Sequence, residues 1–395
     1  MLKSCDHMLT PSLITSSSTL SLSNLMDEVG RHHPDTLLEL FLLRDNDIDE
    51  CFEADMSEAT LASIVASGTF VEDFMKWIMK LVGSKNWRRN RHGIVSLVDW
   101  VTNLGRVREP RSYWFSGIAT YFPGIVVCDG AGHDDSRQLR KDSIAALVNA
   151  IRIACRLYNA NWMQQPVVEM VCGTVLDFCS CMQCQKMQAD IRDRRQAMKQ
   201  DSMQCFLVGN RSKKLDVLLD NLVEVCTTAE QHEECVGRPW SLALELEPGI
   251  TYLLNGEASL EMLHQKLKKR GRASSKDAIL KRHVGLNLDV AHYSIAGVPV
   301  GIIEKLRSII IHGHICDTPG MHTRDLPVGK WTSASDPSSA TRQMLEILSS
   351  EAQKQRSRSM PSMSRCVSLE LEGCGRLDWV QQGLSNLSYL LRAIG

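Results

Sequence analysis

Four segments of this chain read LALELEPG (242–249), VGLNLDVAH (284–292), IIIHGHICD (309–317) and VSLELEG (367–373). Each is a short aliphatic run that ends in carboxylates or histidines. A strand of a parallel sheet is buried on both faces and therefore appears in sequence as an unbroken aliphatic run. Because barrel enzymes place their reactive side chains at the carboxyl ends of the strands, the four segments predict a polar site at one mouth of a parallel β-barrel.

Helical patterns separate these segments, and the same alternation extends toward the N-terminus. Two earlier runs, PGIVVCDGAG (123–132) and PVVEMVCGTV (166–175), are predicted strands. Six strands, each followed by a helical pattern, favour an α/β fold of the (β/α)8 TIM-barrel type. The first two strands must then lie in the N-terminal region, where they are irregular or unrecognisable in the sequence. A doubly wound open sheet is the alternative fold, but no glycine-rich phosphate turn follows an early strand. The predicted helices cover 144–158, 215–223, 259–269, 300–307, 340–353 and 378–394.

The chain divides into three predicted parts. Residues 1–25 are Ser-rich and are predicted to be disordered. Residues 26–115 are mostly helical in pattern, with room for the first barrel strands, and apolar residues recur there at helical spacing from Val71 to Val82. Residues 116–395 are predicted to form the barrel.

Composition is that of an ordinary soluble globular protein. The 395 residues are 44% hydrophobic and 23% charged, with a net charge of −1. The most basic stretch, KNWRRNRH (85–92), is short and is interpreted as a solvated turn, so no nucleic-acid partner is expected. No apolar run approaches the roughly 18 residues of a membrane span, and the N-terminus lacks the pattern of a signal peptide. Fourteen cysteines without that signal predict reduced thiols and a cytoplasmic location.

Two segments end in a pair of alternating glutamates. Glu245 and Glu247 share one face of their strand, as do Glu370 and Glu372, because side chains alternate along a strand. Two carboxylates on one face are costly unless a positive group lies nearby, and a divalent cation would supply it. Glu245 and Glu370 are the favoured ligands. The alternative is that either pair reaches solvent beyond the end of its strand.

The other two segments supply an aspartate and histidines. Asp289 ends its run and His292 follows three residues later, so the two can converge as the strand turns over. An aspartate there can instead cap a helix. His312 and His314 alternate along one strand, and the residue nearer the end, His314, is the favoured ligand, with His312 a hydrogen-bonded neighbour.

The donor set indicates one divalent ion. Glu245, Asp289, His314 and Glu370 provide three carboxylates and one imidazole. Such an oxygen-rich set suits Mn²⁺, Mg²⁺ or Co²⁺, with Zn²⁺ as the alternative.

Two further groups of residues could carry a function. The loop DTPGMHTRDLPVG (317–329) contains Arg324 and Asp325, and an arginine there can clamp a carboxylate, a phosphate or a hydroxyl pair. Three cysteines, Cys179, Cys181 and Cys184, have the spacing C-x-C-x-x-C, with Cys172 nearby. They lack a paired C-x-x-C and an assigned fourth ligand, so we interpret them as free thiols.

The four segments resemble the xylose-isomerase-like superfamily of sugar isomerases, epimerases and apurinic endonucleases. The resemblance rests on E-x-x-P-G, L-D-x-x-H, H-x-H-x-x-D with a later P-x-G, and S-x-E, and it covers about residues 120–395. It implies that Glu245, Asp289, His314 and Glu370 hold a divalent metal. It also implies that His292 binds substrate or a further metal, that Arg324 contacts substrate and that Glu169 is a pocket residue. The chain departs from the family in its N-terminal third and at PVGKW (327–331), where relatives carry an acidic Gly-Glu-Gly.

The first functional hypothesis is an isomerase or epimerase of a small sugar or hydroxy-ketone, active in carbohydrate metabolism. Glu245 and Glu370 would act as base and acid through an enediolate. The expected substrate-binding residues are Glu169, Glu247, His292, His312, Arg324 and Asp325.

Two other hypotheses compete with the first. One is a metal-dependent phosphodiesterase resembling the apurinic endonucleases, in which His133 and His292 would join a metal cluster. The other is a barrel that binds a ligand without catalysis. The sequence leaves the assembly state open, with a homo-oligomer among the outcomes.

Overall fold

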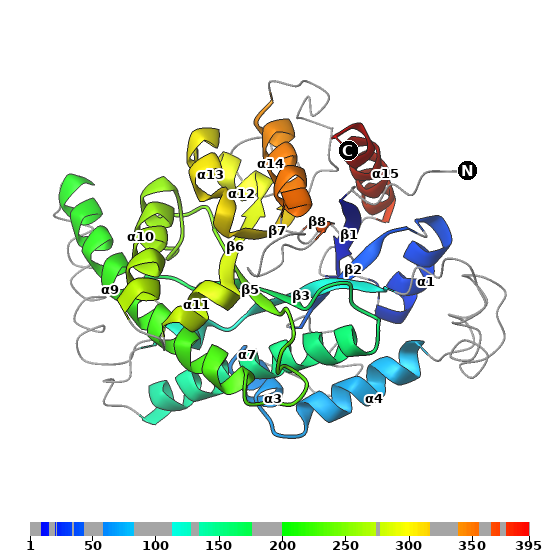
Figure 1. The fold of residues 1–395 in the computed structure, drawn as a ribbon, viewed down its shortest axis with the longest axis horizontal. Coiled ribbons are helices and arrows are strands. Elements are labelled where there is room, and N and C mark those ends of the chain that lie inside the picture. The colour runs from blue at the N-terminus through cyan, green and yellow to red at the C-terminus, as the bar shows by residue number, and fades with distance from the viewer. Residues whose placement is uncertain are drawn as a thin grey trace.

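The chain folds into a closed barrel of eight parallel strands that pair in sequence order, with β8 returning to β1. This is a (β/α)8 TIM barrel, in which helices alternate with the strands (Figure 1). The computed structural model describes residues 9–15, 20, 22–33, 35–42, 58–82, 113–127, 134–175, 200–273, 277–316, 339–354, 365–371 and 377–394.

The strands are short and almost entirely buried. Their bounds are β1 Thr10–Ile14, β2 Leu37–Phe41, β3 Phe115–Tyr121, β4 Val167–Val171, β5 Ser241–Glu245, β6 Val284–Asp289, β7 Ile310–Ile315 and β8 Cys366–Leu369. The last four lie in the four segments that predicted the barrel, so that prediction is confirmed. The strand predicted at 166–175 is β4.

The helices lie outside the strands and pack on them through apolar faces. The α-helices are α1 Leu22–His32, α3 Glu58–Val65, α4 Phe70–Val82, α7 Asp134–Asn159, α9 Gln200–Ala229, α10 Glu257–Ala273, α11 Ala278–His283, α12 Val290–Ile295, α13 Val300–Leu306, α14 Ala340–Lys354 and α15 Leu377–Ile394. Two short 3-10 helices are η2 Pro123–Val126 and η3 Arg307–Ile309. The final helix, α15, contacts both β1 and β8 and so covers the point where the barrel closes.

The N-terminal part needs the largest correction. Strand β1 and the start of α1 lie within the stretch 1–25, where disorder was predicted, whereas β2 lies within residues 26–115, which left room for the first barrel strands. The barrel therefore begins at Thr10 and not at residue 116. Tertiary pairing explains the error, since β1 lies between β2 and β8 and needs no strong strand signal of its own.

The strand predicted at 123–132 is also wrong. Strand β3 lies earlier, over Phe115–Tyr121, and Pro123 begins the 3-10 helix η2. Proline has no backbone N–H for a sheet ladder. The sequence of β3, FSGIATY, carries small and polar residues at its inward positions and so hides the strand.

Two strand pairs carry a register shift that inserts one extra residue. Between β6 and β7, Leu286 pairs with Ile310 but Asn287 pairs with His312, which leaves Ile311 extra. Between β2 and β3, Leu38 pairs with Phe115 but Glu39 pairs with Gly117. Bulges of this kind re-aim side chains and are common beside active sites.

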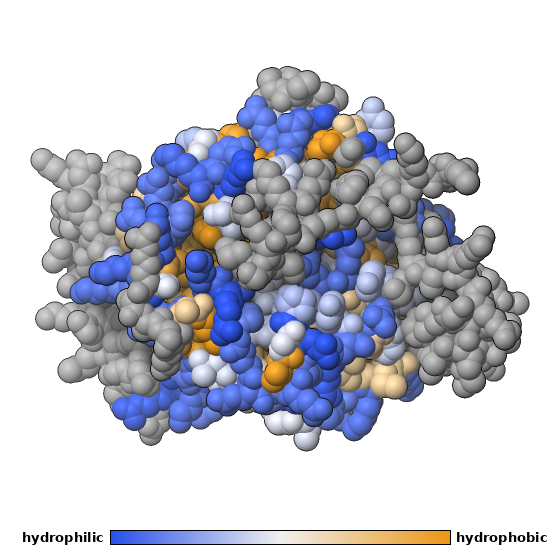
Figure 2. Space-filling view, viewed as in Figure 1, coloured by the Kyte–Doolittle hydropathy of each residue, from blue (hydrophilic) through white to orange (hydrophobic). Residues whose placement is uncertain are grey.

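The face of the molecule seen in Figure 2 is mostly hydrophilic among its described residues. Figure 2 shows the described residues of one face, on which hydrophobic residues form small separate groups. Among the described helices, none has the length and apolar content needed to cross a bilayer. Six cysteines whose side chains the structure describes are buried and form no disulfide: Cys155, Cys172, Cys226, Cys235, Cys316 and Cys366.

Candidate metal centre

Four side chains from four strands meet inside the mouth of the barrel. Glu245 ends β5, Asp289 ends β6, His314 lies near the end of β7, and Glu370 follows β8 directly. One potential ligand atom from each lies within 4.8 Å of the others, and all four residues are buried. The four residues expected to converge do so, because parallel strands bring their carboxyl ends to the same edge.

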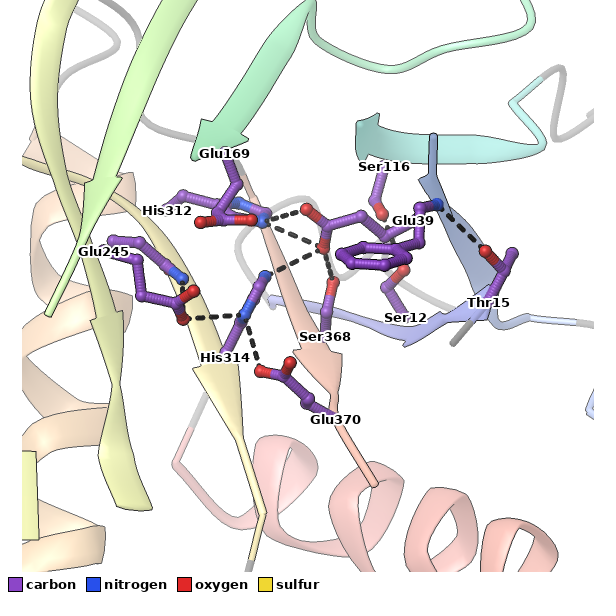
Figure 3. A network of polar contacts seen from close by, with 12 residues as sticks. Ser12, Thr15, Glu39, Ser116, Glu169, Glu245, His312, His314, Ser368 and Glu370 are labelled. Carbon is purple, nitrogen blue, oxygen red and sulfur yellow. Dashed lines mark hydrogen bonds and ion pairs between the residues drawn. The ribbon is translucent and has the colours of Figure 1, made fainter. Parts of the chain in front are cut away.

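His314 is the centre of this group. Its Nδ1 lies 3.0 Å from Oε2 of Glu370 and 3.3 Å from Oε1 of Glu245. Figure 3 shows the two glutamates approaching the ring from different sides. Oε1 of Glu245 also accepts a hydrogen bond of 2.9 Å from the side-chain amide of Asn287, which sets the orientation of that carboxylate.

Asp289 combines the two roles that the sequence left open. Its Oδ1 accepts a 2.6 Å hydrogen bond from the backbone N–H of His292 and so caps α12. Its Oδ2 is buried without a hydrogen-bond partner among the described residues. A buried carboxylate oxygen without a donor is costly, so Asp289 fits a position in which a cation lies nearby.

Glu247 and His292 extend the cluster toward the rim. Nδ1 of His292 donates to the backbone oxygen of Leu246 at 2.9 Å and lies 3.8 Å from Glu245 and 3.9 Å from Glu247. Burial lowers the pKa of His292, but the charges of Asp289, Glu247 and Glu245 outweigh burial and raise that pKa to about 10. The side chain of Glu247 is 19% exposed, whereas that of His292 is only 4% exposed.

Glu169 projects from β4 into the same interior. The residue is 2% exposed, and its Oε1 has no hydrogen-bond partner among the described residues. Burial and the adjacent charge of Glu245 raise the pKa of Glu169 well above its usual value. Glu169 therefore tends to hold a proton beside Glu245. The thiol of Cys172 is buried next to this pair, and burial followed by the charge of Glu169 raises its pKa as well.

Sequence reasoning missed Glu39. This residue lies in the middle of β2, has no solvent exposure, and contacts both histidines of β7 (Figure 3). Nε2 of His312 is 3.0 Å from both of its oxygens, and Nε2 of His314 is 3.1 Å from Oε2. The signal was present, since LLELF (37–41) is an aliphatic run with a single central carboxylate, like the four segments that were recognised.

Glu39 and His314 each favour the charged form of the other. Burial alone would raise the pKa of Glu39, but His312 and His314 lower it well below its usual value, so Glu39 is a carboxylate. Burial would lower the pKa of His314, but Glu39 and hydrogen bonds to Glu245 and Glu370 raise it well above its usual value. Without an ion, a proton on His314 therefore occupies the place where a cation would be held.

The other predicted site residues have different outcomes. His312 lies against Glu39, and its ring meets that of His314 edge-on with centroids 5.1 Å apart. Several residues lie outside the described ranges: Arg324, Asp325, Glu372, His133, Cys179, Cys181 and Cys184.

No family model matches the chain, and no curated protein matches it in sequence. Solved structures do match, among them a structure of L-ribulose 3-epimerase at 13% sequence identity and a TM-score of 0.49, covering 98% of this chain and 96% of that chain. A likeness at this level says nothing about activity. The pairing of the strands establishes the barrel independently.

Proposed function

We propose that this chain is a divalent-metal-dependent isomerase or epimerase of a small sugar or a related hydroxy-ketone. The observation that carries the proposal is the convergence of Glu245, Asp289, His314 and Glu370 from four strands, with potential ligand atoms within 4.8 Å of one another. The order of the motifs along the chain, which resembles the xylose-isomerase-like superfamily, supports it further.

The residues present fit a divalent ion. Three carboxylates and one imidazole form a hard donor set of the kind that Mn²⁺, Mg²⁺ or Co²⁺ prefers, and Zn²⁺ is the alternative. Oδ2 of Asp289 lacks a donor among the described residues, and the buried carboxylates repel one another without a cation. Asn287 holds Glu245 in place through a hydrogen bond of 2.9 Å. Neighbours that orient ligands in this way are typical of metal sites.

When bound, the ion would supply a Lewis acid that stabilises negative charge on the oxygens of a hydroxy-ketone. Glu370 and Glu245 each direct one oxygen at Nδ1 of His314, namely Oε2 and Oε1 respectively. The second oxygens, Oε1 of Glu370 and Oε2 of Glu245, are then the atoms that take a proton from the substrate carbon and return it. Because the two carboxylates come from different sides of His314, removal and return on opposite faces would invert that carbon.

The remaining residues of the mouth would bind the substrate. His292 donates from Nδ1 to a backbone oxygen, so its Nε2 is the ring atom left for a hydroxyl. Glu247 at the rim and Glu169 in the interior would contact other hydroxyls, with Glu169 as a donor because it holds a proton. Arg324 and Asp325 remain proposed substrate contacts from the sequence.

The test combines an exchange assay with metal analysis. The wild-type chain loaded with Mn²⁺ should exchange a substrate C–H proton for deuterium when ketoses are screened in deuterated water. Glu370→Gln and Glu245→Gln should abolish exchange while keeping the fold, as judged by circular dichroism. Full exchange in either variant contradicts the proposal. An exposed replacement, Glu233→Gln, is the matched control and should exchange like the wild type.

One observation favours a second candidate function. Glu245, Glu247 and His292 form another group whose potential ligand atoms lie within 4.8 Å of one another. A site with two ions would favour a metal-dependent phosphodiesterase, since paired ions clamp both oxygens in such reactions. Metal content separates the two candidates: one ion per chain favours the isomerase, and two or three favour the phosphodiesterase.

A further inference from the structure

The carboxylate of Glu39 is the most enclosed charged group near the candidate metal centre. It has no solvent exposure, and the side chains of His312, His314 and Ser368 point toward it (Figure 3). His312 and His314 both donate to it through Nε2, at 3.0 and 3.1 Å, and the hydroxyl of Ser368 donates to Oε2. A buried carboxylate with three donors is fixed in position as well as in charge.

One register shift between the described strands lies at Glu39, and the other lies beside His312, which contacts Glu39. The extra residue in β3 is inserted where Glu39 pairs with Gly117, and the extra residue in β7 directly precedes His312. Ile311 contributes to an interior apolar layer with Val167 and Ala243. The bulge thus lets Ile311 and His312 both face inward, although they are adjacent in sequence.

The backbone around Glu39 leaves room for its carboxylate. A Cβ on Gly117 would lie 3.4 Å from Oε1 of Glu39 and 3.2 Å from a backbone oxygen of β4. The carboxyl end of β2 is also held, since the backbone N–H of Phe41 donates to the hydroxyl of Thr15 on the neighbouring chain segment at 2.9 Å. A Cβ at position 117 would therefore press on the backbone oxygen of Val167 and reach this carboxylate at van der Waals distance.

A neutral imidazole carries one proton, on Nδ1 or on Nε2, and its partners decide which. In His314, Nε2 faces Glu39, which can only accept. On binding an ion, the imidazole would therefore keep its proton on Nε2 and offer the lone pair of Nδ1 on the side where Glu245 and Glu370 lie. Histidines that bind metals are oriented by carboxylates in this way.

We propose that Glu39 is a positioning residue for the metal centre, which holds the ring of His314 with Nδ1 directed at the ion, while His312 and Ser368 keep Glu39 in place. This inference rests on the proposed function, because it assumes that Glu245, Asp289, His314 and Glu370 hold an ion. It assigns His312 to the support of Glu39 and removes it from the substrate contacts.

The test measures Co²⁺ binding by absorption titration of the metal-free chain. Glu39→Gln keeps the size of the side chain but offers an amide that can donate to Nε2, and it should raise the Kd for Co²⁺ by about 10- to 100-fold. Glu39→Asp keeps the charge but shortens the side chain, so it should also weaken binding if position matters and not merely charge. Ser12→Ala is the matched control: it removes a buried hydrogen bond to Ser116 that does not involve the histidines, and the Kd should stay within about twofold.

A second readout reports the ring itself. In the Zn²⁺-loaded protein labelled with ¹⁵N-histidine, His314 should show a protonated Nε2 whose hydrogen exchanges slowly with water. That signal should be lost in Glu39→Gln and kept in Ser12→Ala. A purely structural role of Glu39 would lower stability without moving this signal.

The outcomes separate this inference from the proposed function. If the wild type binds one Co²⁺ and Glu245→Gln loses it, but Glu39→Gln binds as tightly as the wild type, the positioning role is wrong and the proposed function stands. If the wild type binds two ions and Glu39→Gln binds one, Glu39 is itself a ligand and the positioning role is wrong. If the wild type binds no ion, the proposed function fails first, and this inference with it. Should Glu39→Gln not fold, Ser368→Ala decides: a Kd raised by about threefold or more supports the role, and an unchanged Kd contradicts it.

Discussion

Glu169 and Glu245 are buried carboxylates on the neighbouring strands β4 and β5. In the chain without an ion, burial and the charge of Glu245 raise the pKa of Glu169 well above its usual value. The native state must then keep a proton that the unfolded chain releases above about pH 4.3. Stability therefore falls as the pH rises above that value, and the loss continues until the native carboxyl itself ionises.

Replacing Glu169 by glutamine removes this cost. With chelator present, Glu169→Gln should raise the free energy of unfolding at pH 7 by about 1–3 kcal/mol, and the gain should vanish at pH 4, where the wild-type carboxyl is protonated in both states. Urea denaturation at a series of pH values measures it. The exposed control Glu233→Gln should show no such gain. Equal stability of Glu169→Gln and the wild type at pH 7 would mean that the two carboxylates are not in conflict.

His292 also makes the stability of the chain decline as the pH rises, but for a different reason. Burial lowers its pKa, yet Asp289, Glu247 and Glu245 raise it to about 10. An imidazolium with a raised native pKa stabilises the chain fully below the unfolded value of about 6.5. The stabilisation disappears as the pH rises from there toward 10. In the metal-free chain, the difference in unfolding free energy between the wild type and His292→Gln should shrink by a few kcal/mol over this range. A difference that does not change with pH would show that His292 is not charged in the native chain.

Single site residues could be predicted where a carboxylate or a histidine follows a long aliphatic run. Glu245, Asp289, His314 and Glu370 each follow such a run, and all four meet. Glu39 carries the same mark in a run of only five residues, LLELF, and the surrounding helical patterns concealed it. The positions of the protons on His312 and His314 depend on Glu39. Because Glu39 was not recognised in the sequence, these positions could not be predicted.

The elements that position the site are strands with tight contacts and two bulges. Period-two alternation correctly predicted that His312 and His314 share a face, but it cannot show the extra residue at Ile311, because a bulge depends on the pairing partner. Strand β3 was misplaced for a similar reason. Its sequence, FSGIATY, contains Ser116, Gly117 and Thr120, so it lacks the aliphatic signal of its neighbours.

Gly285 on β6 tests the contact that accompanies the bulge in β7. A Cβ at this position would lie 2.5 Å from the backbone oxygen of Ile309 and 2.8 Å from the side chain of Ile311. Gly285→Ala should therefore lower the free energy of unfolding by about 1–3 kcal/mol, because a backbone atom must shift. Urea denaturation measures the change.

The matched control for Gly285→Ala is Gly301→Ala. Gly301 is exposed on α13, and an added Cβ there would meet nothing within 4 Å. That substitution should cause no loss of stability and can give a small gain, since alanine favours helix more than glycine does. If Gly285→Ala is as stable as Gly301→Ala, β6 and β7 are not packed as tightly at the bulge as the structure indicates.

At the scale of the whole molecule, the barrel unites residues that are far apart in the chain. β1 pairs with β8, and Glu39 on β2 contacts histidines on β7, although more than 270 positions separate them. The eight-stranded closure was predictable because six later strands imply two earlier ones. The place of the first two was not, since β1 and β2 are only five residues long and their identity comes from the partners on either side.

The central claim is that four strands of this barrel hold one divalent ion, and Asp289→Asn tests it most directly. Asparagine is also a good N-cap, so the variant should keep α12 while losing the unpaired charge on Oδ2. Calorimetric titration with Mn²⁺ should find one ion per wild-type chain and at least about tenfold weaker binding, or roughly 1.4 kcal/mol, in Asp289→Asn. A wild type that binds no Mn²⁺, or an Asp289→Asn variant that binds it as tightly as the wild type, would contradict the account.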